Sequence, residues 1–242
     1  MESAVLEGLV IVLVALVAST LAAVTGFGAS LILLPILTWT FGVRDAVPML
    51  AVVQVCTNLA RVWFNRDDIV VPIARRFSMG AVPAAVLGGI VFATAPASAL
   101  GRLIGVFMLL SLAFRHTRIG RNLTVRQETF LPLGAGFGFL DAMVGSTGPV
   151  QAPFFLAAGL TGASYIGTEA LASVIMHGTK LGVYGGFSLV TGTAVAYGLA
   201  IGAVMFLGAF FGRGILQHIS PGRFSLIIEG VLVVAGVLLI VG

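Results

Sequence analysis

Apolar runs of about 17 to 22 residues follow one another along most of the 242-residue chain, separated by short connections. As α-helix, a run of this length crosses about 30 Å of hydrocarbon. Only 9% of the residues are charged, whereas about a quarter are charged in soluble domains. The runs do not alternate apolar with polar residues, as transmembrane β-strands do. The sequence therefore predicts an all-α polytopic membrane protein.

Ten hydrophobic segments are expected, in two halves of five. They cover about residues 4–24, 26–41, 46–64, 73–94, 98–114, 129–143, 145–158, 164–184, 193–211 and 222–241. We assign 1–114 to a first transmembrane repeat, 115–128 to a basic cytoplasmic linker and 129–242 to a second transmembrane repeat. The interval 129–158 is short for two passes through a bilayer, which favours a re-entrant hairpin.

Basic residues gather in three connections, at 65–76, 115–128 and 212–223, whereas three other connections carry no charge. The positive-inside rule places the basic connections in the cytoplasm. Both termini are then predicted outside, and the two repeats are inverted because each has an odd number of segments. We expect a multi-pass protein of the cell inner (plasma) membrane. The net charge of +4 reflects this topology, and no nucleic-acid partner is expected.

Each half contains a glycine-broken stretch followed by a helix with polar residues. The first reads TGFGASLILLP and leads to AVPMLAVVQVCTNL, and the second reads VGSTGPVQAP and leads to TEALASVIMHGTK. Glycine lets the backbone turn and approach a ligand. A helix that begins at such a break directs unpaired N–H groups and the positive end of its dipole towards it. Inverted repeats with interrupted helices are typical of secondary transporters, whose sites lie near the midplane of the bilayer.

Arg61 and Lys180 occupy equivalent positions in the two repeats, in apolar spans where a charge costs about 2.5 to 3.5 kcal/mol. Polar residues share their helical faces at spacings of i, i+4, i+7. We therefore expect an anion site, with the substrate-binding candidates Thr25, Gly26, Gly28, Ser30, Gln54, Asn58, Arg61, Gly145, Ser146, Thr147, Gly148, Ser173, His177 and Lys180. Two alternatives remain open: the cations snorkel to the membrane surface, or the glycines only permit close helix packing.

Asp141 and Glu169 are candidates for proton coupling, because burial favours the neutral form of a carboxyl group. An equally simple interpretation is that one of them only neutralises Lys180. The equivalent positions of the first repeat hold Ala23 and Leu50, so any coupling would be confined to the second half. The sequence contains no zincin, Walker or Gly-x-Ser-x-Gly motif, and we expect no catalytic residue, no cofactor and no metal.

The two glycine-rich breaks, each followed by a proline, and the alanine-rich helices after them resemble the sulfite exporter TauE/SafE family, also called the toluene-sulfonate uptake permeases. The resemblance covers nearly the whole chain, including its length and its repeat. It implies a membrane permease for sulfite, sulfonates or other small anions. The chain departs from the family pattern at Ala29 and Ser30, where a third glycine is usual, and its second break carries Ser146 and Thr147. These hydroxyl groups suggest a hydrogen-bonded oxyanion.

The sequence thus predicts a secondary transporter that moves a small sulfur-containing or organic anion, such as sulfite or a sulfonate, by alternating access. One alternative is a passive anion channel. Another is an intramembrane enzyme in which His177 acts with Asp141 or Glu169. The expected partners are the small anionic substrate and the lipid bilayer, and a homodimer is compatible with the sequence.

Overall fold

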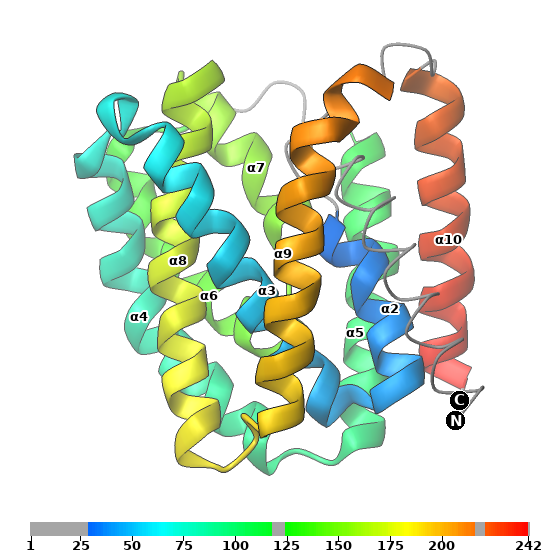
Figure 1. Ribbon diagram of the computed structural model, residues 1–242. Coiled ribbons are helices and arrows are strands. Elements are labelled where there is room, and N and C mark those ends of the chain that lie inside the picture. The colour runs from blue at the N-terminus through cyan, green and yellow to red at the C-terminus, as the bar shows by residue number, and fades with distance from the viewer. Residues whose placement is uncertain (1–28, 118–123, 216–220, 242) are drawn as a thin grey trace.

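The computed structural model describes residues 29–117, 124–215 and 221–241, and the regular elements of these ranges are helices (Figure 1). They are α2 (Ala29–Phe41), α3 (Val43–Phe64), η1 (Arg66–Asp68), α4 (Val71–Thr94), α5 (Ala97–His116), η3 (Gln127–Thr129), α6 (Phe130–Val144), α7 (Gly148–Ala157), α8 (Gly162–Gly186), α9 (Gly192–Ile215) and α10 (Pro221–Val241). The predicted all-α class is confirmed, and the predicted segments from 26 onwards correspond to α-helices. The predicted segment 4–24 lies outside the described residues.

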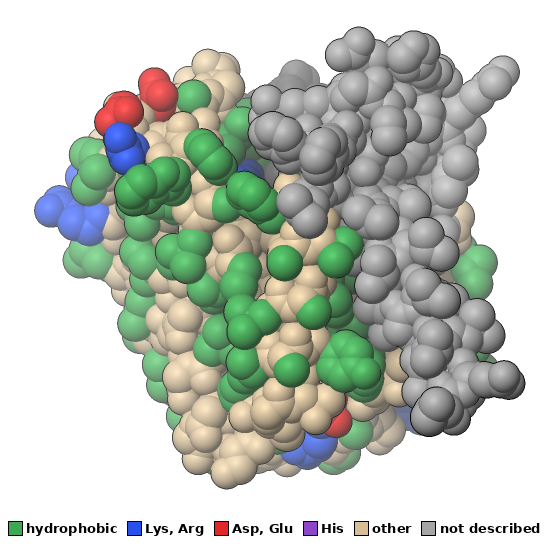
Figure 2. Space-filling model, viewed as in Figure 1, with side chains coloured by type: hydrophobic (Ala, Val, Ile, Leu, Met, Phe, Trp, Pro, Cys, Tyr) green, Lys and Arg blue, Asp and Glu red, His purple; other side chains and the backbone are tan. Residues whose placement is uncertain are grey.

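Within the described ranges, α3, α4 and α5 are long and apolar enough to cross a membrane. Figure 2 shows hydrophobic side chains spread over the visible face of the bundle and charged side chains near its ends. Trp39, Trp63 and Phe64 are exposed near the ends of α2 and α3, where interfacial aromatic residues are expected. Helices α2, α3, α4 and α7 each contain an internal proline, which membrane helices tolerate.

The closest helix packing joins α4 to α6 through glycines. A Cβ atom built on Gly80 would lie 2.0 Å from the carbonyl oxygen of Leu131, and one built on Gly134 would lie 2.0 Å from that of Phe77. Gly88 and Gly138 meet the opposite backbone in the same way, at 2.5 Å. Only glycine fits at these positions, so the small residues allow the two backbones to touch. This packing holds α6 directly against α4.

Helices α6 and α7 form a hairpin that turns inside the protein. They have 15 and 10 residues, or about 22 Å and about 15 Å of helix, and neither length reaches across 30 Å of hydrocarbon. The backbone N–H of Val125, before α6, donates to the carbonyl oxygen of Ala157 at the end of α7 (3.2 Å). The hairpin therefore enters and leaves on the same side of the bundle, as expected for the short interval 129–158.

Helix α3 packs against α8 and α9, α4 packs also against α8, and α5 packs against α10. Two apolar clusters surround the centre. One is built around Leu33, Leu37 and Leu50, and the other around Phe77 and Phe155. The contact between α3 and α8 brings the polar faces of these helices together, and the turn between α6 and α7 lies beside them.

Candidate functional site

The turn between α6 and α7 is buried. Ser146 and Thr147 are at most 1% exposed. Gly145 ends α6 with φ at +85°, a left-handed conformation that glycine adopts without steric cost. Helix α7 then begins at the half-buried Gly148, with Pro149 in its first turn, where a proline sacrifices no helical hydrogen bond. The N-terminus of α7 is thus held inside the protein, next to polar groups from other helices.

Ser30 of α2, which follows the first glycine-rich stretch in the sequence, contacts this turn. Ser30 and Ser146 lie 116 positions apart in the chain, yet their Oγ atoms are 2.6 Å apart. Gln54 of α3 links the same region, because its Nε2 donates to the carbonyl oxygen of Gly145 (2.9 Å) and its Oε1 accepts from Ser146 Oγ (3.5 Å). Residues of α2, of the middle of α3 and of the turn before α7 therefore share one polar cluster.

Lys180 of α8 is fully buried and binds the turn through Asp141 of α6. Its Nζ donates to Asp141 Oδ1 (2.5 Å) and to the carbonyl oxygen of Gly145 (3.0 Å). Asp141 Oδ2 accepts from the backbone N–H (2.9 Å) and the Oγ1 (3.0 Å) of Thr147, and His177 Nδ1 lies 3.3 Å from Asp141 Oδ1. The snorkelling alternative does not apply to Lys180, because its side chain is 0% exposed.

Arg61 forms a second ionic cluster, between α3 and α8. One terminal guanidinium nitrogen of Arg61 donates to Asn58 Oδ1 (2.8 Å) and lies 2.9 Å from Glu169 Oε2. Glu169 Oε1 accepts from Ser173 Oγ (2.8 Å), and Asn58 Nδ2 donates to the carbonyl oxygen of Gln54 (2.9 Å). The side chain of Arg61 is 28% exposed. This cluster is therefore the more accessible of the two.

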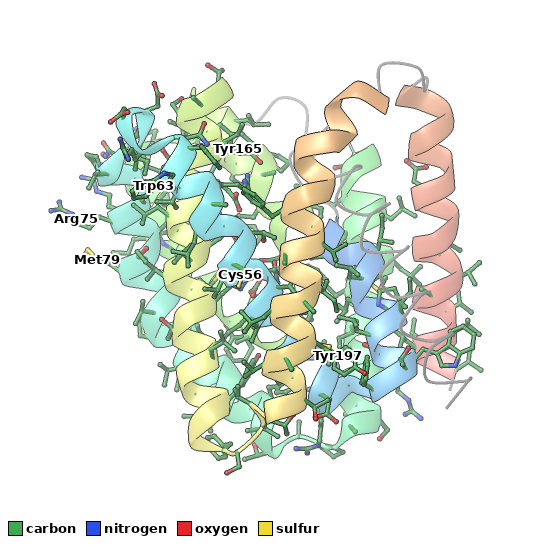
Figure 3. The ribbon with its side chains drawn as sticks, viewed as in Figure 1. Cys56, Trp63, Arg75, Met79, Tyr165 and Tyr197 are labelled. Atoms are coloured by element: carbon green, nitrogen blue, oxygen red, sulfur yellow. The ribbon has the colours of Figure 1, made fainter. Side chains whose placement is uncertain are left out.

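The Arg61 cluster lies towards one end of the bundle. Trp63 is two residues from Arg61 on α3, and Tyr165 is one turn from Glu169 on α8. Both are found near the end that also holds η1 (Figure 3). Gln54 lies deeper along α3, where it contacts the buried turn. The polar residues of α3 and α8 thus form a path that leads from that end of the protein to the turn.

Eleven of the fourteen predicted binding residues fall in these clusters or at the start of α7, while Thr25, Gly26 and Gly28 lie outside the described residues. The sequence left open which carboxylate neutralises Lys180. The structure pairs Lys180 with Asp141 and pairs Glu169 with Arg61 of the other half. The two clusters thus hold two positive and two negative formal charges, which balance one another.

Sequence reasoning missed two groups at the turn. Tyr184 of α8 donates its hydroxyl to the carbonyl oxygen of Ala142 and so helps to hold the end of α6. Gln151 of α7 is 1% exposed, and neither polar atom of its side chain has a hydrogen-bond partner among the described residues. Its position directly after the second break, within VQAP, was the available signal.

Comparison with protein families gave one finding. A family model described as Sulfite exporter TauE/SafE matches residues 11–239 of the chain. The comparisons with curated proteins and with solved structures gave no match. The matched range spans both halves of the chain and includes every residue of the two clusters described above.

Proposed function

The chain belongs to the sulfite exporter TauE/SafE family, and from this we propose that it is a secondary transporter for a small sulfur-containing or organic anion, such as sulfite or a sulfonate. The observation that carries the proposal is the contact of Ser30, which follows the first glycine-rich stretch, with the buried turn before α7, where Ser30 Oγ lies 2.6 Å from Ser146 Oγ. Interrupted helices inside a bundle form the usual substrate site of secondary transporters.

The groups around the breaks are suited to an oxyanion. Helix α7 begins there, so its N-terminal N–H groups and its dipole favour negative charge. Hydroxyl and amide donors come from Ser30, Ser146 and Gln54. Arg61, two helical turns from Gln54 on α3, supplies a guanidinium that can bind two oxygens of one anion. We assign the remaining candidates, including Thr25, Gly26 and Gly28, to the same site by the equivalence of the two breaks.

We propose that the two halves are inverted repeats that move relative to one another during alternating access. Helix lengths support this, because α3 and α8, which correspond to one another in the two halves, have 22 and 25 residues. Helix packing supports it too. In the proposed repeat, α2 to α5 correspond in order to α7 to α10. Exchanging corresponding helices converts the α3–α9 contact into the α8–α4 contact, and it leaves the α3–α8 and α5–α10 contacts unchanged.

The proposed orientation in the inner membrane follows from the charges. The basic connection between α3 and α4 lies at the end of the bundle opposite to the C-terminal end of α10 (Figure 1). The positive-inside rule then assigns the η1 end to the cytoplasm and the end of α10 to the outside. The polar path beside Arg61 would face the cytoplasm in this orientation.

Counterflow in proteoliposomes tests the transporter. Vesicles preloaded with unlabelled sulfite, or with unlabelled methanesulfonate, receive the same anion labelled with ³⁵S outside. A carrier exchanges the two pools, so the label transiently overshoots its equilibrium level, and the initial rate saturates. Competition by acetate tests whether the site prefers sulfur oxyanions to a carboxylate. Competition by sulfate tests whether it prefers monovalent to divalent anions.

Arg61→Met should reduce this exchange by about 10- to 100-fold, because a hydrogen bond to a charged group contributes about 1.5–3 kcal/mol. The matched control is Arg75→Met on the exposed part of α4, which should exchange at the wild-type rate. A flux without overshoot or saturation would instead indicate a channel, and recovery of the label in another compound would indicate an enzyme. Absence of exchange for both anions in folded protein would contradict the proposal.

A further inference from the structure

The two buried carboxylates of the site differ in how firmly they are held. Asp141 uses both oxygens: one receives Lys180 Nζ, and the other receives the N–H and the hydroxyl of Thr147. Neutralising Asp141 would leave Lys180 with an uncompensated buried charge and the turn before α7 without its acceptor. Asp141 therefore has a fixed role in the architecture of the turn.

Glu169 has fewer partners. Its Oε1 accepts one hydrogen bond, from Ser173. Its Oε2 is paired with the guanidinium of Arg61 at 2.9 Å and accepts no hydrogen bond from the other described residues. The same guanidinium nitrogen also donates to Asn58. Glu169 is thus held by one hydrogen bond and one ion pair, and its partner Arg61 is partly exposed.

The balance of charge sets a condition on the substrate. Arg61 and Lys180 are matched by Glu169 and Asp141 in the described site. An anion that enters adds a negative charge with no counter-charge, which is costly away from water. A proton that binds together with the anion removes this cost. Glu169 is the carboxylate that can accept this proton with the smaller loss of hydrogen bonds.

We propose that Glu169 is an internal counter-ion, which a monovalent oxyanion replaces at Arg61. A proton from the aqueous phase binds Glu169 Oε2 and breaks the ion pair, and the substrate takes the place of the carboxylate on the guanidinium. When the anion leaves, Glu169 releases the proton and pairs with Arg61 again. This inference rests on the transporter function proposed above, and it makes transport of a monovalent anion electroneutral, with one proton per anion.

Other titratable groups near Glu169 come from several elements. Arg61 of α3 and Tyr165 and His177 of α8 interact with it electrostatically, and α6 contributes Asp141, already paired with Lys180. Helix α7 has no charged residue. Charged residues of η1 and α4, which also pack against α8, are exposed or half-exposed: Arg66, Asp67, Asp68, Arg75 and Arg76. Arg61 is therefore the cation whose ion pair with Glu169 the protonation would break.

The test uses methanesulfonate, which stays a monoanion over the whole working pH range and so carries no proton itself. Vesicles contain a pH-sensitive dye. For the wild-type protein, an inward methanesulfonate gradient should acidify the lumen, and an acidic exterior should accelerate uptake several-fold. In Glu169→Gln the acidification should disappear, and uptake should instead respond to the membrane potential. Glu128→Gln, an exposed carboxyl group outside the site, is the matched control and should retain the proton signal.

A second measurement needs only the wild-type protein. Because anion and proton bind together, the apparent affinity for methanesulfonate should fall as pH rises, by up to about tenfold per pH unit. Affinity that is constant from about pH 5 to about pH 8 would overturn the inference, as would proton uptake that persists in Glu169→Gln. Counterflow of sulfite without any counterflow of methanesulfonate would also overturn it, because the site would then not accept a monovalent sulfonate. The transporter itself is tested by the counterflow, which does not depend on proton coupling.

Discussion

Asp141 connects the end of a helix in the site to a buried cation. It lies in the last turn of α6, accepts from Thr147 on the far side of the turn, and pairs with Lys180 on α8. Each partner would be costly to bury alone, because a buried charge without a counter-charge is strongly unfavourable. The pair is therefore best regarded as a support for the turn, which leaves Arg61 as the cation nearer to the exposed end of the site.

We predict that Lys180→Met destabilises the protein, because it leaves Asp141 charged and buried without its counter-charge. The expected loss is about 3–5 kcal/mol in the free energy of unfolding. The double variant Lys180→Met with Asp141→Asn should recover much of this loss, since it removes both charges. Thermal unfolding of the purified variants, arranged as a double-mutant cycle, measures the coupling. Additive effects of the two substitutions would mean that the ion pair contributes nothing to stability.

Among the helices, α4 and α6 make the contact that depends most on the absence of side chains. Gly134 of α6 faces the backbone of Phe77, whereas Gly136, two positions later on the same helix, has nothing within 4 Å of an added Cβ. The difference follows from the helical period, because residues two apart point in different directions. A glycine on α6 can thus be either a packing requirement or a neutral surface position.

Gly134→Ala should therefore separate α4 from α6 and lower stability by about 1–3 kcal/mol, the usual cost of overpacking. Gly136→Ala is the matched control, and it should be neutral or stabilising by up to about 1 kcal/mol because alanine favours helix. Unfolding temperatures in the same detergent compare the two variants. Equal behaviour of Gly134→Ala and Gly136→Ala would show that α4 and α6 do not touch as described.

For the molecule as a whole, the decisive feature is the contact between Ser30 and Ser146. The two residues lie in different proposed repeats, and their hydroxyl groups are in direct contact. The proposed alternating access requires the repeats to move relative to one another about this region. A covalent link at the contact should then hold the protein in one conformation.

Cysteines at both positions provide that link. In a Cys56→Ser background, which removes the native cysteine, the pair Ser30→Cys and Ser146→Cys should form a disulfide under mild oxidation, because the side chains touch. Anion counterflow should then stop and return on reduction. The two single-cysteine variants are the controls and should exchange anions with or without oxidant. Failure of the pair to cross-link would contradict the contact between Ser30 and Ser146.

Local patterns in the sequence were sufficient to locate the described helices and to name residues that could belong to a site. Apolar run lengths, the glycines at 145 and 148 and the polar spacing on α3 and α8 are local properties, and helices form locally once the chain is in an apolar medium. The predicted segments therefore agree with the described helices to within a few residues. The proposed repeat places Arg61 and Lys180 at equivalent positions.

Which carboxylate meets which cation depends on the packing of the helices and was not predictable from the sequence. The acids have no counterparts in the first half, where Ala23 and Leu50 stand, so the repeat could not assign Asp141 to Lys180 or Glu169 to Arg61. Ion pairing depends on how α3, α6 and α8 cross, and crossing is set by side chains far apart in the sequence, such as the glycines between α4 and α6. The packing of the helices therefore creates the difference between the two ion pairs, and the role proposed for Glu169 rests on this difference.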